Sequence, residues 1–364
     1  MSGGPLPVVL LAGGGTGGHV FPMVAVADAL RAAAGVRVVY VGTARGIEAR
    51  VVPERGDELE VLDILPIKGG GPRGALRGIG RAAAALPRAR ALIKRLSPRA
   101  VLAVGGYAAG PMGLAAWFSR VPLAILEPNS VLGLSNRWLS PFVRRAYVAF
   151  PGMERKMRRG VAVRTGVPLR GAFRPSPYAP EADRLRVLVL GGSSGAKALN
   201  EVVPRALAKA AREVSGLSVV HQTGRDREAY VAQLYRELGA LGRAKVVPFL
   251  DDIATELARA DLVIERSGAS SLAELCAVGR PSILVPFPFA ADDHQRKNAE
   301  ALAESGAAVC LKQSDATALR LAAEVVSLAR DEGRRVRMAQ AARDQGRPDA
   351  AREVALDLLK VGHV

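Results

Sequence analysis

Residues 8–22 read Val-Val-Leu-Leu-Ala-Gly-Gly-Gly-Thr-Gly-Gly-His-Val-Phe-Pro, and this stretch decides the fold. The apolar run 8–12 is typical of a buried strand, and residues 20–33 repeat apolar side chains at helical spacing. The glycines between them carry no side chains, so their backbone amides can approach a ligand closely. The helix start adds partial positive charge, which favours a phosphate or a developing oxyanion. The stretch predicts a strand, an anion-binding turn and a helix beginning near His19. A tight turn with a capping histidine is the simpler alternative.

The composition is typical of helices packed on parallel sheets. Hydrophobic residues make up 49% of the 364 residues and aromatic residues only 4%, so Ala, Val and Leu do most of the packing. Cys276 and Cys310 are too few for a disulfide framework or a cysteine metal site. No signal peptide or apolar run of transmembrane length occurs. We therefore expect two domains in a soluble, reducing, cytoplasmic setting.

Basic residues are concentrated in the first half of the chain. Residues 1–174 hold 25 Lys and Arg against 9 Asp and Glu, whereas residues 175–364 hold 26 against 25. Residues 64–126 contain no acidic residue and the following basic ones: Lys68, Arg73, Arg77, Arg81, Arg88, Arg90, Lys94, Arg95, Arg99 and Arg120. Such a region favours an anionic partner.

Two features of this basic region favour a membrane surface over nucleic acid. No aromatic residue lies between Lys68 and Arg99 to stack on bases, and no nucleic-acid-binding motif occurs. Leucine and isoleucine interleave with arginine through 76–93, and Trp117 and Phe118 follow. We expect contact with an anionic membrane and none with nucleic acid. A solvated basic helix face is the alternative interpretation.

The first domain alternates apolar runs with helical patterns, which predicts a parallel sheet with crossover helices. Glycine-rich residues 68–80 are expected to form a loop. Ligands of such sheets bind beyond the carboxyl ends of the strands, where the glycine turns lie. The expected strands are 8–12, 36–41, 60–65, 100–104 and 123–126, and the expected helices are 20–33, 46–55, 80–96 and 110–119.

A second unit of the same type follows a proline-rich linker at 168–183. The last helix, about 350–359, has no strand after it and is expected to pack on the first domain. We predict an α/β protein of two Rossmann-like domains facing a cleft, over 1–168 and 169–345, with 346–364 returning to the first. Expected strands of the second unit are 186–190, 217–221, 245–248, 261–265, 282–285 and 308–311, with a glycine turn at 191–196 and a helix at 199–214.

Both glycine turns are near misses to standard nucleotide motifs. Gly13, Gly15 and Gly18 satisfy G-x-G-x-x-G, but the acid that should bind a ribose is missing at 41–43. The turn at 191–196 lacks the Gly-Lys-Ser/Thr of a P-loop. The two turns can still bind an anion, but neither matches a standard nucleotide-binding motif.

The most informative stretch of the second domain is 261–274, Asp-Leu-Val-Ile-Glu-Arg-Ser-Gly-Ala-Ser-Ser-Leu-Ala-Glu. A strand ends at Glu265, and a helix that begins near Ser270 presents backbone amides that suit a diphosphate. Glu274 lies about one turn further, where its carboxylate can accept both hydroxyls of a ribose. A capping or surface carboxylate is the alternative. No second His or Cys stands at ligand spacing near His294, which argues against a metal site.

Taken in order, the motifs resemble the MurG family of glycosyltransferases. The resemblance covers nearly the whole chain and implies a GT-B fold. It further implies an inverting N-acetylglucosaminyltransferase that joins N-acetylglucosamine from its UDP-sugar to the C4 hydroxyl of N-acetylmuramoyl in lipid I, forming lipid II for peptidoglycan, without a metal or other cofactor. The matching motifs are 14–22, 105–111, Glu127-Pro128-Asn129 with Asn136-Arg137, 191–196, 266–269 with Glu274, and His294-Gln295 with Asn298.

The resemblance also implies roles for single residues. His19 matches the family's proposed base, and Glu127 is the second candidate. The implied donor-binding residues are Thr16, Gly17, Gly18, Asn129, Arg170, Ser193, Leu250, Ala269, Ser270, Ser271, Glu274 and Gln295. The implied acceptor-diphosphate residues are Gly14, Gly15, Gly105, Gly106 and Tyr107. Pro128, Val167 and Ser194 depart from the family pattern, which bears on Asn129 and Arg170.

A lipid-linked acceptor implies a peripheral location at the cytoplasmic face of the inner membrane, docked through residues 64–126, with cell-wall or division proteins as further partners. Three other interpretations stay open. One is a UDP-sugar transferase with another lipid acceptor, such as diacylglycerol. Another is a non-catalytic nucleotide-sugar-binding membrane module, against which the retention of His19, Glu127 and Glu274 argues. An NADP oxidoreductase is the third, supported by Arg45 alone.

Overall fold

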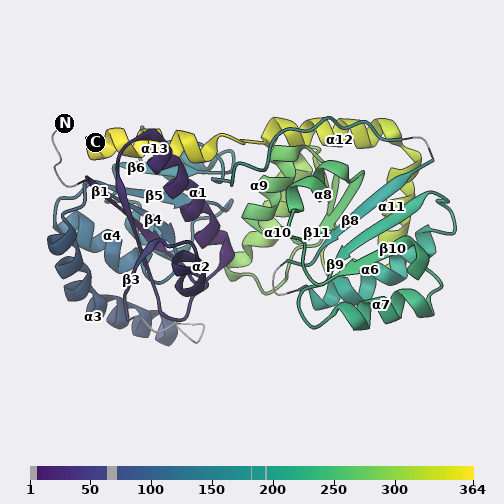
Figure 1. The fold of residues 1–364 in the computed structure, drawn as a ribbon, viewed down its shortest axis with the longest axis horizontal. Helices are drawn as coiled ribbons and strands as arrows, with labels where there is room; N and C mark the ends of the chain where they lie inside the picture. The colour runs from purple at the N-terminus through teal and green to yellow at the C-terminus, as the bar shows by residue number, and fades with distance from the viewer. Residues whose placement is uncertain (1–5, 64–71, 182, 193–194) are drawn as a thin grey trace. The chain divides into compact units, whose positions relative to one another are not determined.

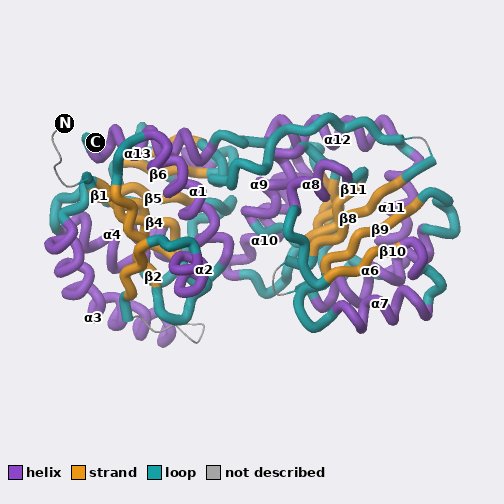
Figure 2. Tube along the Cα trace, viewed as in Figure 1, coloured by secondary structure: helices purple, strands orange, loops and turns teal. Residues whose placement is uncertain are grey.

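The computed structural model describes residues 6–63, 72–181, 183–192 and 195–364, with the backbone alone at 72–83. The chain divides into two compact units (Figure 1). Unit 1 is Met1–Gly171 with Pro348–Val364, and unit 2 is Ala172–Arg347. These divisions fall a few residues after the 168/169 and 345/346 boundaries expected from the sequence. Each unit has a parallel sheet with helices on both faces (Figure 2).

The sheet of unit 1 has strand order β3-β2-β1-β4-β5-β6-β7, and every neighbouring pair is parallel. All six residues of β1 and of β4 are buried, because both strands are central and covered on both faces. The order reverses between β1 and β4, which is where doubly wound sheets bind ligands. The strands are β1 (Val8–Gly13), β2 (Arg37–Gly42), β3 (Glu58–Val61), β4 (Ala100–Gly105), β5 (Leu123–Glu127), β6 (Arg145–Val148) and β7 (Ala162–Arg164).

Two helical layers enclose this sheet. Helices α3 and α4 bury Ala89, Leu92 and Met112 against one face. Helices α1 and α13 cover the other, so the last helix of the chain lies beside the first (Figure 1). The helices of unit 1 are α1 (Gly17–Ala33), α2 (Glu48–Glu54), α3 (Pro72–Leu96), α4 (Ala109–Phe118), α5 (Leu134–Leu139), η1 (Met153–Lys156) and α13 (Ala350–Gly362).

Unit 2 repeats the arrangement with strand order β10-β9-β8-β11-β12-β13. Helices α6, α7 and α11 bury one face, and α9 lies beside α8 and α12. Its strands are β8 (Leu185–Leu190), β9 (Leu217–Gln222), β10 (Ala244–Val247), β11 (Leu262–Glu265), β12 (Ser282–Leu284) and β13 (Ala308–Cys310). Its helices are α6 (Lys197–Ala210), α7 (Glu228–Glu237), η2 (Leu241–Arg243), α8 (Ile253–Arg259), α9 (Ala269–Val278), η3 (Ala291–Asp293), α10 (His294–Glu304), α11 (Ala318–Arg330) and α12 (Glu332–Gln345).

The structure corrects three expectations about local structure. The strand expected at 60–65 is β3 at 58–61, set by its pairing with β2; residues 64 and 65 lie outside the described residues. The loop expected at 68–80 was wrong from Pro72 onward, because α3 begins there; proline suits the first helical position, and the buried second half of α3 sustains the helix. Helix α5 and strands β6 and β7 were not predicted, since they are only three to six residues long.

Candidate functional site

The first glycine turn joins β1 to α1 and adopts a backbone that needs glycine. Gly14 and Gly15 have φ values of 143° and 88°, a region that side chains disfavour. The helix begins at Gly17, directly after Thr16 in extended conformation, so it starts two to three residues earlier than the start expected near His19 and Val20. The early amides of a helix have no intrahelical partner. This end of α1 therefore presents N–H donors just beyond the sheet.

Chain topology brings a second glycine pair against this turn. Strand β4 pairs with β1 so that Gly13 lies opposite Gly105. Gly105 and Gly106 have φ values of 113° and 81°. A Cβ atom on Gly106 would lie 2.4 Å from the carbonyl oxygen of Gly14, so only glycine fits there. Tyr107 follows and is 37% exposed. Segments about 90 residues apart thus form one small-residue surface.

His19 lies at the junction of these two turns. Its Nδ1 is 3.1 Å from the carbonyl oxygen of Gly14 and 3.4 Å from the hydroxyl of Thr16. A carbonyl can only accept, so Nδ1 carries the proton and the lone pair of the neutral ring is on Nε2. Nε2 lies over Gly105, where a Cβ would be 2.8 Å away. The imidazole is therefore oriented as a hydrogen-bond acceptor above the glycine surface.

Glu48 supports the first glycine turn and belongs to none of the motifs recognised in the sequence. The side chain is fully buried in the first turn of α2. One carboxylate oxygen accepts the N–H of Gly15 at 2.8 Å, and the other accepts the N–H and hydroxyl of Thr43 at 2.9 and 3.0 Å. The Gly15 amide is therefore already bound within the protein. The one available signal was an acidic residue at a helix start six residues after β2.

Glu127, at the end of β5, holds the loop that follows it. Its carboxylate accepts N–H groups of Asn129 at 3.1 and 3.2 Å, the backbone N–H of Gly133 at 2.8 Å and the side-chain amide of Asn136 at 3.0 Å. The residue is 2% exposed. A carboxylate with this many donors fixes loop geometry. Asn129 is placed by Glu127 in spite of the neighbouring Pro128.

Arg170, near the end of unit 1, stacks over Phe21 on α1. The guanidinium carbon lies 5.5 Å from the ring centroid. Phe21 in turn contacts the first turn of α1, since a Cβ on Gly17 would be 3.0 Å from its ring. Stacking of this kind orients a guanidinium without neutralising it. Arg170 thereby brings a positive charge to the start of α1.

The second glycine turn, after β8, rests on buried polar side chains. Gly192 and Gly195 have φ values of 75° and 71°, and the predicted donor residue Ser193, with Ser194, lies outside the described residues. The side-chain amide of Gln222 donates to the carbonyl oxygens of Gly192 and Pro248 at 3.0 and 3.1 Å. These bonds tie the turn to the end of β9.

A buried hydrogen-bond chain, whose residues belong to none of the sequence motifs, lies behind this turn. The hydroxyl of Tyr235 is 3.1 Å from Nδ1 of His221, whose Nε2 is 3.2 Å from Oδ1 of Asn200. The amide of Asn200 donates to the carbonyl of Thr223 at 2.9 Å. Burial lowers the pKa of His221 to about 3, so the ring is neutral. A Cβ on Gly195 would lie 2.5 Å from the Thr223 carbonyl, so this chain supports the turn.

Helix α9 begins at Ala269, after the turn 266–268 that follows β11, so its first turn contains Ala269, Ser270 and Ser271. The Ser270 hydroxyl is buried and has no hydrogen-bond partner among the described residues. Glu274 is half-buried one turn later. Burial, and then the charge of Glu274, raise the pKa of Glu265 at the end of β11 well above its usual value. Glu265 therefore loses its proton at a higher pH than an exposed glutamate, and Glu274 contributes to this shift.

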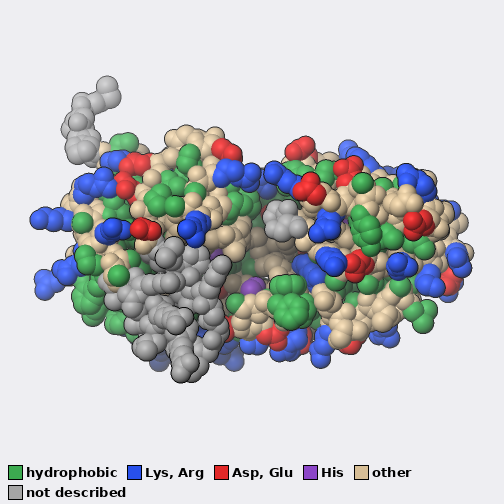
Figure 3. Space-filling model, turned by 90° about the horizontal axis from the view of Figure 1, so that it is seen from below, with side chains coloured by type: hydrophobic (Ala, Val, Ile, Leu, Met, Phe, Trp, Pro, Cys, Tyr) green, Lys and Arg blue, Asp and Glu red, His purple; other side chains and the backbone are tan. Residues whose placement is uncertain are grey.

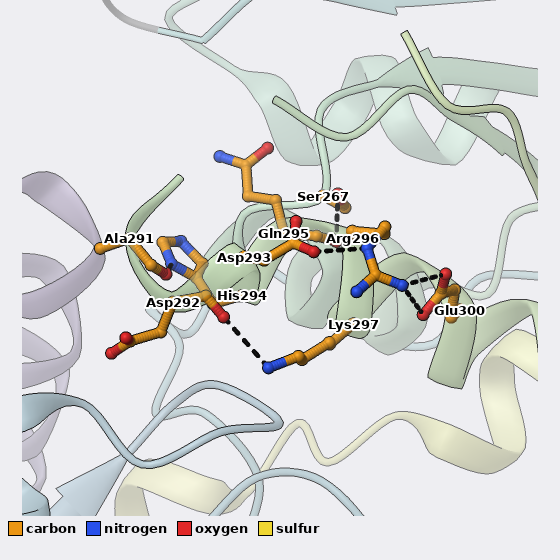
Figure 4. A network of polar contacts seen from close by, with 9 residues as sticks. All are labelled: Ser267, Ala291, Asp292, Asp293, His294, Gln295, Arg296, Lys297 and Glu300. Carbon is orange, nitrogen blue, oxygen red and sulfur yellow. Dashed lines mark hydrogen bonds and ion pairs between the residues drawn. The ribbon is translucent and has the colours of Figure 1, made fainter. Parts of the chain in front are cut away.

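Gln295 lies in the first turn of α10 (Figure 4) and accepts hydrogen bonds at two oxygens. Its side-chain oxygen accepts the backbone N–H of Phe287 at 3.0 Å, and its carbonyl accepts the hydroxyl of Ser267 at 2.8 Å. Ser267 belongs to the turn before α9, so Gln295 and the start of α9 are linked. Its side-chain nitrogen supplies two N–H donors.

The chain enters α10 through two non-glycine residues with positive φ, Asp292 at 51° and Asp293 at 56°. Such conformations cost about 1 kcal/mol or more and persist where neighbours enforce them. Arg296 bonds both Asp293 and Glu300, and Lys297 donates to the carbonyl of Asp292 at 3.2 Å (Figure 4). This network fixes the helix start that carries Gln295. Leu250, one of the predicted donor-binding residues, is buried just after β10 and beside the 55% exposed Phe249.

Aromatic and basic side chains meet on the surface of α3 and α4 in unit 1. Trp117 packs at a tilted angle against Phe118 and Phe142, at 4.8 and 4.5 Å between ring centroids, and Trp117 and Phe118 are 43% and 51% exposed. Arg90 lies over the Phe118 ring at 6.0 Å. Arg90, Lys94 and Arg99 line a hollow of about 820 Å³. Figure 3 shows basic and hydrophobic side chains interspersed on the face that it presents.

Two negative observations apply to the described part of the chain. Among those residues, no helix is both long and apolar enough to cross a bilayer. The same residues hold no group of three or more His, Cys, Asp and Glu side chains arranged to bind a metal ion. Metal independence stays a prediction.

Both domains match one family of glycosyltransferases. Residues 9–148 match the glycosyltransferase family 28 N-terminal domain, and residues 186–354 match the glycosyltransferase family 28 C-terminal domain. A protein of Sorangium cellulosum named UDP-N-acetylglucosamine--N-acetylmuramyl-(pentapeptide) pyrophosphoryl-undecaprenol N-acetylglucosamine transferase is 62% identical, covering 97% of this chain and 88% of that protein. A protein of the same name from Acidithiobacillus ferrooxidans is 46% identical over 95% and 96%. The crystal structure of Acinetobacter baumannii MurG superposes with a TM-score of 0.81 at 33% identity, covering 97% of this chain and 99% of that one.

Proposed function

The chain belongs to the MurG family within glycosyltransferase family 28, and on this basis we propose how its residues carry out the reaction. The protein is a GT-B hexosyltransferase that transfers N-acetylglucosamine from UDP-N-acetylglucosamine to N-acetylmuramyl-(pentapeptide) pyrophosphoryl-undecaprenol. The observation that carries the residue assignment is the orientation of His19. Its Nδ1 is bound to the Gly14 carbonyl and its Nε2 lies over the glycine surface at the β1/β4 switch point.

In the proposed reaction His19 is the general base. The C4 hydroxyl of the acceptor N-acetylmuramoyl attacks the anomeric carbon, and Nε2 takes the hydroxyl proton as the new carbon–oxygen bond forms. The bond between the anomeric carbon and the diphosphate breaks, and UDP leaves with the electron pair. One displacement of this kind inverts the configuration at the anomeric carbon. The bond from Nδ1 to the Gly14 carbonyl supports this role, because in the neutral ring it leaves the lone pair on Nε2.

We assign the donor mainly to unit 2. The first turn of α9, with Ala269, Ser270 and Ser271, suits the diphosphate because its amides and the unpartnered Ser270 hydroxyl are donors. Glu274 is placed one turn further, where it would accept the ribose hydroxyls. Gln295 would donate to the sugar, and the backbone of Leu250 would contact the uracil. Ser193 lies outside the described residues, and its donor-binding role is the one that the family resemblance implies. Family positions on unit 1 assigned to the same donor are Thr16, Gly17, Gly18, Asn129 and Arg170.

The acceptor diphosphate is assigned to the two glycine turns of unit 1, formed by Gly14, Gly15, Gly105, Gly106 and Tyr107. The missing side chains and the start of α1 support this assignment. Because the Gly15 N–H is bound to Glu48, the donors must come from the other amides of this surface. Glu127 is kept as the second candidate for the base, but its four donors favour a role in positioning Asn129.

A transfer assay tests the proposed reaction. The protein is incubated with radiolabelled UDP-N-acetylglucosamine and a lipid I analogue in EDTA, with diacylglycerol as a parallel acceptor. Labelled disaccharide-lipid in EDTA is the expected product. Transfer to diacylglycerol alone would show that the acceptor is misassigned, and transfer restored only by added Mg²⁺ would show that metal independence is wrong.

We further propose that unit 1 docks on an anionic inner-membrane surface through the aromatic and basic side chains of α3 and α4. Trp117 and Phe118 would enter the interface while Arg90 and Lys94 contact lipid phosphates. The double variant Arg90→Glu/Lys94→Glu should lose binding to vesicles containing anionic lipid, and high salt should weaken wild-type binding. Arg352→Glu/Lys360→Glu, which reverses two exposed charges on α13, is the matched control. Equal vesicle binding by both variants would exclude this surface.

A further inference from the structure

One peptide group of the first glycine turn is hydrogen-bonded at both ends. Its N–H, on Gly15, donates to the Glu48 carboxylate at 2.8 Å. Its carbonyl, on Gly14, accepts the Nδ1–H of His19 at 3.1 Å. A buried carboxylate is thus connected to the imidazole through a single peptide unit.

We propose that Glu48 is a positioning residue for the transfer reaction, acting on His19 through the Gly14–Gly15 peptide. The inference rests on the proposed role of His19 as the base. Hydrogen bonds in a chain polarise one another, so a negative charge at the N–H end makes the carbonyl a stronger acceptor. The carbonyl then holds the Nδ1 proton more firmly and stabilises the imidazolium that forms as Nε2 takes up the acceptor proton. Glu48 itself touches neither substrate.

The pocket of Glu48 is shaped for this single side chain. Cβ atoms on Gly14, Gly42 and Gly46 would lie 2.2, 2.4 and 2.0 Å from atoms of Glu48, so three glycines leave room for it. Three donors point at its two oxygens, as needed for a carboxylate shielded from water. The peptide that Glu48 binds also binds His19. We therefore expect the loss of Glu48 to affect the proposed base as well as the turn.

Few other charged groups belong to the segments around the imidazole. The Arg170 guanidinium, stacked over Phe21, is a fixed positive charge near the start of α1 and is unchanged in the variants below. Residues 17–27 of α1 contain no titratable side chain besides His19. The β2–α2 loop carries exposed Arg45, and the β4–α4 loop carries Tyr107. At the end of β5, the Glu127 carboxylate is bound to its own loop. A change in the pH dependence of the base is therefore traced most directly to Glu48.

The test is Glu48→Gln, which keeps the shape but removes the charge. We expect kcat to fall about tenfold or more with the KM for UDP-N-acetylglucosamine within about twofold of wild type. The acid limb of the pH profile of kcat should move lower by about one pH unit, because the imidazolium loses its stabilising charge. Thr43→Val is the matched control: it removes one donor from the other carboxylate oxygen and should leave the acid limb in place.

Unit 1 folding is checked from the fluorescence of Trp117 and Trp138, the only two tryptophans of the chain. If Glu48→Gln does not fold, Glu48→Asp keeps the charge at shorter reach and should lower kcat with the acid limb in place. The inference would be overturned if Glu48→Gln kept the kcat and the acid limb of the wild type. If only Glu48→Asp can be prepared, a wild-type kcat in that variant would overturn it. Retained activity in His19→Ala would instead show that the proposed base is wrong.

Discussion

At the residue scale, His19 and Glu274 are assigned to different steps, so their loss should have different kinetic signatures. His19→Ala should lower kcat by about 10²–10⁴-fold with little change in donor affinity, because it removes proton transfer alone. Glu274→Ala should raise the Kd for UDP-N-acetylglucosamine about tenfold or more, because it removes charged hydrogen bonds to the ribose. Steady-state kinetics and equilibrium UDP-sugar binding distinguish the two. Equal losses of donor affinity would contradict these assignments.

The buried carboxyl group of Glu265 is expected to make the stability of the protein depend on pH. Its folded-state pKa is raised above the usual 4.5, first by burial and then by Glu274, so the unfolded chain loses this proton more readily. Stability from this group is complete below pH 4.5 and falls as pH rises from there to the folded-state pKa, by about 1.4 kcal/mol per pH unit. Glu265→Gln should remove this loss. Calorimetry at pH 5 and pH 8 should show that the variant gains stability over wild type at the higher pH; an equal difference at both values would refute it.

At the scale of elements, α13 shows how a terminal helix is tied to a distant sheet. Asp357 accepts from Arg145 at 2.9 Å and from the hydroxyl of buried Tyr147 at 3.0 Å, both on β6. Burial and this carboxylate raise the pKa of Tyr147, so its hydroxyl stays protonated as a donor. Asp357→Ala should destabilise unit 1 by about 1–2 kcal/mol, since a buried hydroxyl loses its acceptor. Urea unfolding followed by tryptophan fluorescence measures this, and Arg352→Ala on the same helix should leave it unchanged.

At the scale of the whole molecule, the two units provide independent readouts of the donor assignment. Both tryptophans are in unit 1, whereas the main donor contacts are assigned to unit 2. Saturating UDP at about 100 Kd should stabilise the unit that binds it by about 2.7 kcal/mol. We expect the calorimetric transition of unit 2 to move up by a few degrees with UDP, more than the tryptophan-monitored transition of unit 1. A shift confined to the tryptophan signal would place UDP on unit 1.

Much of this architecture follows from the sequence alone, because the information is local. An apolar run followed by glycines and a helical repeat specifies strand, turn and helix at 8–33 without reference to any other segment. The same pattern after 185 predicts a second unit, and the departure of the last helix from the strand–helix alternation indicates that it packs elsewhere. Short elements such as α5 and β7 have too few residues to show a hydrophobic period. The glycines in the first part of α3 are typical of a loop, and the helix is explained only by the burial of its second half.

The arrangement around His19 was decided only by the tertiary structure. Its residue type and place after a glycine turn are visible in the sequence, but its tautomer depends on the Gly14 carbonyl and its surroundings on Gly105, which the β1/β4 pairing brings from a distant segment. The link from Glu48 to the first glycine turn was hidden for the same reason, since Gly15 is brought to it by the adjacency of β1 and β2, whereas Thr43 is only five residues away in the chain. Hydrogen bonds between segments depend on strand order, and strand order is a property of the folded sheet.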